Sequence, residues 1–278
     1  MIAFNKEKEA LDSKQFKQEI LPPSLVNAHW IACAYDELYG HYRSVLEHLL
    51  REFGPDHPEL IYTYHQLGTV CVRKGDSQQG VEYNRKAWRI SLAEKARSDH
   101  QMAESYELLG NSHAENKEYD KGLECLEIAL ESFRELNAKN KIANCYNSIG
   151  ETLRRKGDFS NAIGYLETAI KMSLQLFGKQ DYQTGISFNN LGKLLVQQGK
   201  FDKALPNLYK ARRILTKALS PKHPFTKKSN RWIARAKKAQ AEAASAKGSK
   251  SPAGELLLLE SFEVQGRSSG LFFFMTGC

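Results

Sequence analysis

Hydrophobic positions in this chain recur at helical spacing, and one order of positions returns four times. Beginning at Tyr64, Tyr106, Tyr146 and Phe188, an aromatic residue is followed three positions later by Leu or Ile and then by glycine. Residues three and four positions apart lie on one face of an α-helix. The pattern therefore predicts four helices that each present an aromatic, an aliphatic and a glycine residue on one side.

A second helix is predicted after each of these four. Seven residues beyond the helical glycine stands Gly75, Lys117, Gly157 or Gly199, and glycine at such a place ends a helix in a left-handed conformation. A small residue, and an alanine seven positions later, follow in every copy. Because the copies begin 42, 40 and 42 residues apart, the chain is expected to repeat a pair of antiparallel helices.

The glycines inside the predicted helices need a physical reason, because glycine there costs roughly 1 kcal/mol relative to alanine. Close packing supplies one, since two antiparallel helices about 8 to 10 Å apart need a residue without bulk where they touch. A phosphate-binding loop is the alternative for residues 150–157 and 192–200, but the spacing differs from that motif and no strand precedes it. The glycines with a predicted packing role are Gly68, Gly110, Gly150 and Gly192.

Composition agrees with a helical chain that has a core of its own. Hydrophobic residues make up 41% of the 278 positions and charged residues 26%, and the frequent Leu, Ala, Glu, Lys, Asn and Gln favour helix over sheet. No apolar run approaches the roughly 20 residues of a membrane helix. The five cysteines show no CxxC pair and no metal-ligand spacing. We therefore expect an all-α cytoplasmic protein with no metal site and no cofactor.

The repeated pattern over Asp56 to Ser220 resembles the tetratricopeptide repeat. The segments FGPDHPEL at 53–60, FNNLGKLL at 188–195 and SPKHPF at 220–225 are similar to the kinesin-light-chain type of this repeat. The resemblance implies a right-handed superhelical solenoid of antiparallel helix pairs. A C-terminal capping helix is expected to cover the last pair, because an end repeat has no neighbour to bury its apolar face.

Five segments are expected along the chain. They are a polar N-terminal lead (1–23), a degenerate leading repeat (24–55), four repeats (56–220), a basic capping helix (221–250) and a tail (251–278). The leading repeat is degenerate because Leu38 and Val45 occupy the positions of the small residues. The composition of the tail favours a disordered or atypical extension. The alternative is that Leu256 to Leu259 fold back into the protein's own groove.

The first helices of stacked pairs form the concave wall of such a solenoid, and each carries a polar stripe beside its packing residues. Asparagine can hydrogen-bond the backbone of an extended peptide, and arginine or lysine can select acidic side chains. The resemblance implies that Asn189 and Asn190 match peptide-contacting asparagines. A solvated helix face is the other interpretation of any one residue. The predicted peptide-binding residues are His65, Glu107, Asn111, Asn144, Asn147, Glu151, Arg154, Arg155, Asn189, Asn190 and Lys193.

The predicted function is that of a non-catalytic adaptor or scaffold, which binds a linear, acidic peptide of a protein partner and no small-molecule substrate. No local arrangement of Ser, His and Asp or of Cys and His indicates an enzyme. The alternative is a protein that binds RNA or an acidic lipid surface through residues 221–250, which hold nine Lys or Arg residues and one Glu. A basic helix that only aids solubility is the plain interpretation. Its candidate residues are Lys227, Lys228, Arg231, Arg235, Lys237 and Lys238.

Overall fold

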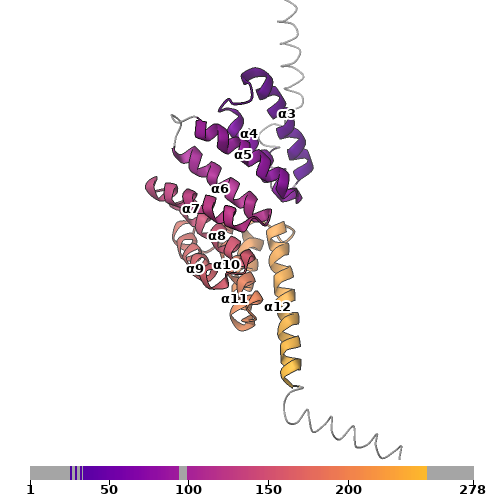
Figure 1. Cartoon of the computed structure of the whole chain (residues 1–278). Coiled ribbons are helices and arrows are strands. Elements are labelled where there is room, and N and C mark those ends of the chain that lie inside the picture. Colours follow the sequence, from indigo (N-terminus) through magenta and orange to yellow (C-terminus); the bar gives the residue numbers. More distant parts are fainter. Residues whose placement is uncertain (1–25, 27–28, 30–31, 33, 94–98, 249–278) are drawn as a thin grey trace, which may run out of the picture.

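The computed structural model describes residues 26, 29, 32, 34–93 and 99–248, and within them it bounds ten α-helices and no strand (Figure 1). The helices are α3 (Tyr35–Phe53), α4 (Leu60–Lys74), α5 (Ser77–Ala93), α6 (Asp99–Glu115), α7 (Tyr119–Glu135), α8 (Lys139–Lys156), α9 (Phe159–Leu176), α10 (Tyr182–Gln197), α11 (Phe201–Ala218) and α12 (Pro224–Gly248). The expectations for the N-terminal lead and for the tail lie outside the described residues.

Consecutive helices pack as pairs, and the pairs stack in chain order. The pairs are α4 with α5, α6 with α7, α8 with α9, and α10 with α11; α3 packs on α4, and α12 packs on α10 and α11. Figure 1 shows the stack running from indigo α3 to orange α11, with the distal part of yellow α12 extending beyond it. The predicted all-α solenoid of antiparallel helix pairs is confirmed.

Two large hydrophobic clusters form most of the core, with a polar layer between them, and a third, small cluster joins Phe188 to Ala211 and Ile214. One cluster joins α3, α4 and α5 around the fully buried Leu38 and Leu67, and the other runs from α6 to α12 around Phe133 and Leu166. Burying one such side chain stabilises the fold by about 1.5 to 3 kcal/mol. The polar layer lies where the first pair meets the second, and Asn84 there donates to Ser112 at 2.8 Å.

The helical glycines lie where two helices touch. A Cβ atom at Gly150 would lie 2.7 Å from Cγ of Leu166, and one at Gly110 would lie 2.9 Å from the backbone oxygen of Gly122. Neither distance leaves room for a methyl group. The predicted packing role is confirmed, because these glycines allow the two helices of a pair to approach closely.

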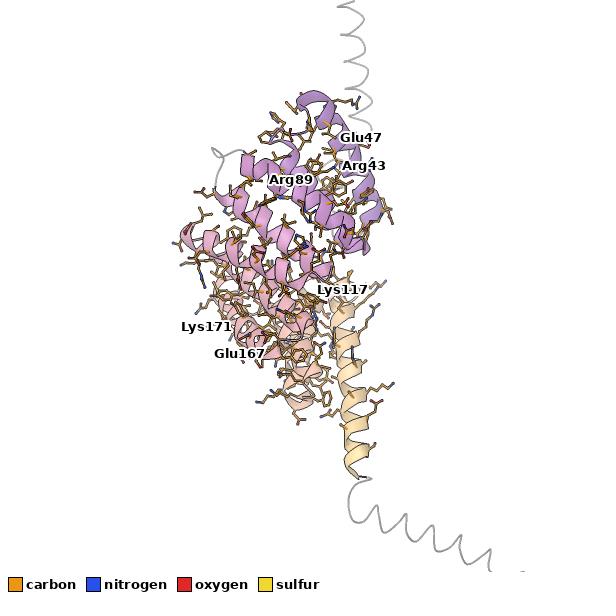
Figure 2. The ribbon with its side chains drawn as sticks, viewed as in Figure 1. Arg43, Glu47, Arg89, Lys117, Glu167 and Lys171 are labelled. Carbon is orange, nitrogen blue, oxygen red and sulfur yellow. The ribbon has the colours of Figure 1, made fainter. Side chains whose placement is uncertain are left out.

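The turn between the helices of each pair is left-handed in all four copies. The φ angles are +97° at Gly75, +65° at Lys117, +96° at Gly157 and +71° at Gly199. Lys117, at the turn between α6 and α7 (Figure 2), therefore adopts a backbone conformation that costs a residue with a Cβ atom about 1 to 2 kcal/mol. Glycine pays no such penalty.

We expect Lys117→Gly to raise the free energy of unfolding by about 1 kcal/mol in urea denaturation. The reverse change, Gly157→Lys, should lower it by a similar amount, because a Cβ atom at Gly157 meets no atom within 4 Å and the cost is that of the backbone alone. A destabilised Lys117→Gly variant would show that the lysine side chain contributes more than its backbone strain costs.

Candidate functional site

The first helices of the pairs together line one cavity of about 340 Å³. Its wall is formed by side chains of α4, α6, α8 and α10, with Asn84 from α5 and Phe225 from the first turn of α12. These helices are about one repeat apart in sequence, so the cavity exists only because the pairs stack in register. It is called the groove below.

Most of the residues predicted to bind peptide lie in the groove wall. They are Glu107, Asn111, Asn144, Asn147, Glu151, Arg155 and Asn190. Asn111 and Asn144 are only half-buried, and within the described part of the chain their side chains make no hydrogen bond. They are the groove asparagines that are most accessible to a ligand.

The structure places the remaining four predicted residues between helices. His65, Arg154 and Asn189 are all buried, and Lys193 lies behind the wall with its ammonium 2.7 Å from Glu151. None of the four lines the groove. Their polar groups are used within the protein, which the spacing along one helix could not reveal.

A hydrogen bond between neighbouring first helices explains the position of three stripe residues. Nδ2 of Asn147 donates to Oγ of Ser187 at 2.6 Å, and Oγ of Ser229 donates to Oδ1 of Asn189 at 2.9 Å. His65 makes the same contact, because its Nε2 lies 3.1 Å from Oγ of Ser105. These bonds hold adjacent repeats in register. The signal in the sequence is a small residue directly before the aromatic position of the repeat, as at Ser105, Cys145 and Ser187.

Burial decides the protonation state of His65. Desolvation lowers the pKa of its imidazole to about 4, so the ring is neutral at physiological pH. A neutral ring can share one hydrogen with the Ser105 hydroxyl. Although serine and histidine are also a nucleophile and its base, Ser105 is fully buried and meets no solvent. The pair is therefore structural.

An ion cluster centres on Glu151 at the wall of the groove. Its carboxylate accepts from Nε of Arg154 at 2.8 Å, from Nζ of Lys193 at 2.7 Å and from Nε of Arg155 at 3.3 Å. Burial by itself raises the pKa of Glu151, but Lys193 and Arg154 outweigh burial and hold this pKa well below its ordinary value. Arg155 also donates to Glu115 at 2.6 Å. Glu151 therefore neutralises part of the positive charge that the sequence assigns to peptide selection.

A second ion cluster joins α6 and α8. Nζ of Lys141 lies 2.7 Å from Glu104 and 3.5 Å from the buried Glu107. Burial raises the pKa of Glu107, and the charge of Lys141 opposes this effect. Two carboxylates share one lysine here, so this cluster has an excess of negative charge.

The part of the chain that the structure describes also bears on metal binding and on membrane insertion. No three His, Cys, Asp or Glu side chains gather there as a metal site would require. None of the described helices is both long and apolar enough to pass through a membrane.

Comparison with known proteins identifies the repeat. Two family models described as tetratricopeptide repeat match residues 101–175 and 184–225. The chain is a tetratricopeptide repeat protein. Its repeats are of the kinesin-light-chain type, as the sequence predicted.

Relatives of this tetratricopeptide repeat protein are distant in sequence. Protein KINESIN LIGHT CHAIN-RELATED 2 of Arabidopsis thaliana is 22% identical over 221 residues, which are 78% of this chain and 33% of the relative. Tetratricopeptide repeat protein 29 of Homo sapiens is 26% identical over 146 residues, which are 52% and 30% of the two chains. The chain thus spans about a third of the length of these relatives.

Solved structures share its fold at low identity. BtubC (BKLC) from P. vanneervenii has a TM-score of 0.59 and 17% identity, covering 88% of this chain and 96% of its own. A Rap protein complexed with Competence and Sporulation Factor has a TM-score of 0.64 and 17% identity, covering 86% of this chain and 68% of its own. At this identity, the likeness concerns the solenoid fold.

The repeat register of this tetratricopeptide repeat protein continues into α12. Ser187 and Ser229 are 42 residues apart, and each hydrogen-bonds an asparagine of the preceding first helix: Ser187 accepts from Asn147, and Ser229 donates to Asn189. Ile233 and Ala236 are buried against α10 and α11. Helix α12 therefore occupies the place of the first helix of a further repeat. At the turn position it carries Ala241, which lets the helix continue to Gly248.

Proposed function

We propose that this tetratricopeptide repeat protein is a non-catalytic adaptor that binds a linear segment of a protein partner in the groove. One observation carries the proposal. Asn84 and Asn147 line the groove, are 1% and 7% exposed, and have Oδ1 atoms that accept no hydrogen bond within the described part of the chain. A buried acceptor without a donor costs about 1 to 3 kcal/mol. A ligand that brings N–H groups into the groove would remove this cost.

An extended peptide supplies such donors at regular intervals along its backbone. Asn111 and Asn144 can add hydrogen bonds from the accessible part of the wall, because an amide side chain both donates and accepts. Contacts of this kind do not depend on the side chains of the peptide. Selection of acidic peptides is assigned to Arg155 and the neighbouring cations, which form charge-assisted hydrogen bonds with carboxylates.

A reducing compartment such as the cytoplasm suits this adaptor. Cys71, Cys125 and Cys145 are free thiols, and burial raises the pKa of Cys71 and of Cys125 to about 11 each. Because the thiolate is the reactive form, a raised pKa makes these cysteines unreactive. We therefore assign them to packing.

The groove is tested by the double variant Asn111→Ala/Asn144→Ala of the full chain. We expect binding of a peptide selected from a random library to weaken about 30-fold, because two hydrogen bonds of about 1 kcal/mol each are lost. The melting temperature should stay unchanged, since neither side chain has a bond to lose within the described structure. Affinity is measured by calorimetry and melting by circular dichroism.

Two control variants distinguish a loss of binding in the groove from a general effect of the substitution and from a loss of stability. Asn207→Ala, at a half-buried position of α11 outside the groove wall, should leave the affinity unchanged, whereas Asn189→Ala should lower the free energy of unfolding by about 1 kcal/mol because Ser229 loses its bond to Asn189. The groove is rejected as the peptide site if the library yields no peptide, or if the double variant binds as tightly as the native protein. In that case RNA or acidic lipid on α12 becomes the next candidate.

A further inference from the structure

The basic face of α12 continues the wall of the groove. In the 42-residue register defined by Ser187 and Ser229, Lys228 takes the place that Ile186 holds in α10 and Asn144 holds in α8. Both of these residues line the groove, and so does Phe225, one turn before Lys228. The basic helix and the groove, which the sequence presents as two separate candidates, therefore meet on one surface.

The curvature of the solenoid brings the end of α4, in the first complete helix pair, close to the start of α12. Cζ of Arg73, at the end of α4, lies 5.5 Å from the centre of the Phe225 ring, and Nζ of Lys228 lies 5.9 Å from it. Arg73 and Arg155 also line the groove. Three cations from α4, α8 and α12 thus surround one end of the groove. These helices are distant in sequence.

Positive charge at this end exceeds the negative charge that is present. Glu151 and Glu115 accept from Arg155, but neither Arg73 nor Lys228 forms an ion pair within the described part of the chain. Desolvation and the charges of Arg73 and Arg155 lower the pKa of Lys228, although Glu115 and Glu151 oppose them. Both Arg73 and Lys228 are exposed, so an anion can reach them.

We propose that Arg73, Arg155 and Lys228 form a phosphate-binding subsite of the groove, which takes a phosphorylated serine or threonine of the partner peptide. A phosphate monoester carries a charge of about −1.5 to −2 and three strong acceptor oxygens, whereas a carboxylate brings a single charge. The guanidinium of Arg73 can bind phosphate through its planar fork, Arg155 can add the N–H groups that its bonds to Glu115 and Glu151 leave free, and the lysine adds a point charge. The subsite rests on the proposed peptide-binding function of the groove.

Inorganic phosphate tests the subsite without any peptide. The full chain is titrated calorimetrically with phosphate at constant ionic strength, alongside Lys228→Gln and Lys227→Gln. Both variants lose one positive charge on the same helix, but in the 42-residue register Lys227 takes the place of Gly185, which does not line the groove, whereas Lys228 takes that of Ile186, which does. We expect saturable binding that weakens about tenfold or more in Lys228→Gln and in Arg73→Gln, and that stays unchanged in Lys227→Gln. Absence of saturable binding, or equal loss in all variants, overturns the subsite.

Peptide libraries then test whether the subsite binds the phosphate group of a phosphorylated peptide. Two libraries that differ only in serine or phosphoserine at one fixed position are captured by the native chain and by Lys228→Gln. Tighter capture of the phosphoserine library by the native chain, lost in Lys228→Gln, supports the proposal. Equal capture of both libraries overturns it and leaves the peptide groove intact. If phosphate binds but neither library is captured, the proposed peptide function fails, and displacement of phosphate by single-stranded RNA would identify a nucleic acid as the source.

Discussion

Replacing Glu151 with alanine is expected to lower the free energy of unfolding by about 3 to 5 kcal/mol. The Glu151 carboxylate is the common partner of Arg154, Arg155 and Lys193, at distances of 2.7 to 3.3 Å. Without it, Lys193 keeps a half-buried charge behind the groove wall that no other carboxylate contacts within the described structure. Removing one partner of a buried ion pair costs far more than the pair itself contributes.

Urea denaturation of three further proteins makes the origin of this loss clear. Glu167→Ala on the exposed face of α9 (Figure 2) should change stability by less than about 0.5 kcal/mol. Glu151→Ala/Lys193→Met should recover most of the loss, because both members of the pair are then absent, and Lys193→Met alone completes the cycle. A double variant as unstable as Glu151→Ala would mean that Arg154 and Arg155, rather than Lys193, depend on the carboxylate.

The same cluster has a defined pH dependence. Because the folded protein holds the pKa of Glu151 well below its ordinary value, the carboxylate contributes stability at pH values above the unfolded pKa of about 4.3. That contribution is lost only as the pH falls through the folded pKa. The stability difference between native protein and Glu151→Ala should therefore be constant from pH 7 to about pH 4.5 and decrease in stronger acid.

Two alanine substitutions at helical glycines are expected to have opposite effects. Gly110→Ala should lower the free energy of unfolding by about 1 to 3 kcal/mol, because its Cβ atom would lie 2.9 Å from the Gly122 backbone oxygen and 2.9 Å from Cγ of Leu126. Gly164→Ala, within α9, meets no atom within 4 Å and should raise it by about 1 kcal/mol through helix propensity. Urea denaturation of both variants measures the difference.

The contrast separates helix propensity from packing, since both substitutions place the same methyl group inside a helix. If Gly110→Ala is as stable as Gly164→Ala, the backbones of α6 and α7 can move apart at no cost. The repeated glycine would then have no packing role in that pair. A loss confined to Gly110→Ala would show that α6 and α7 cannot separate without loosening their shared core around Leu126.

The polar stripe of the first helices serves two purposes that look alike in sequence. Asn147 and Asn189 bond the serine of the next first helix, whereas Asn144 lies in the groove wall and its side chain makes no hydrogen bond to any described residue. Substituting all stripe asparagines together would mix a loss of stability with a loss of binding. The structure separates them, because it shows which amide is already bonded.

The sequence by itself determined the helix pairs, the helical glycines and the left-handed turns. Each depends on residues a few positions apart: Tyr146, Ile149 and Gly150 share one helix face, and Gly157 ends the same helix. Four copies of the pattern then identified the repeat. Local spacing also placed the predicted stripe asparagines on the first helices, and Asn111 and Asn144 line the groove.

Only the tertiary structure decided how the stripe residues are used and where charge accumulates. Asn189 accepts a hydrogen bond from Ser229. Glu151 forms ion pairs with cations of α8 and α10, and Arg73 lies over the ring of Phe225. Apart from the pairing of Glu151 with an arginine of its own helix, these contacts join residues about one repeat or more apart. Their existence depends on the rotation between successive helix pairs, which accumulates along the solenoid and is set by how neighbouring pairs pack. Periodicity within one repeat carries no information about that rotation, so it could not place the end of α4 beside the start of α12.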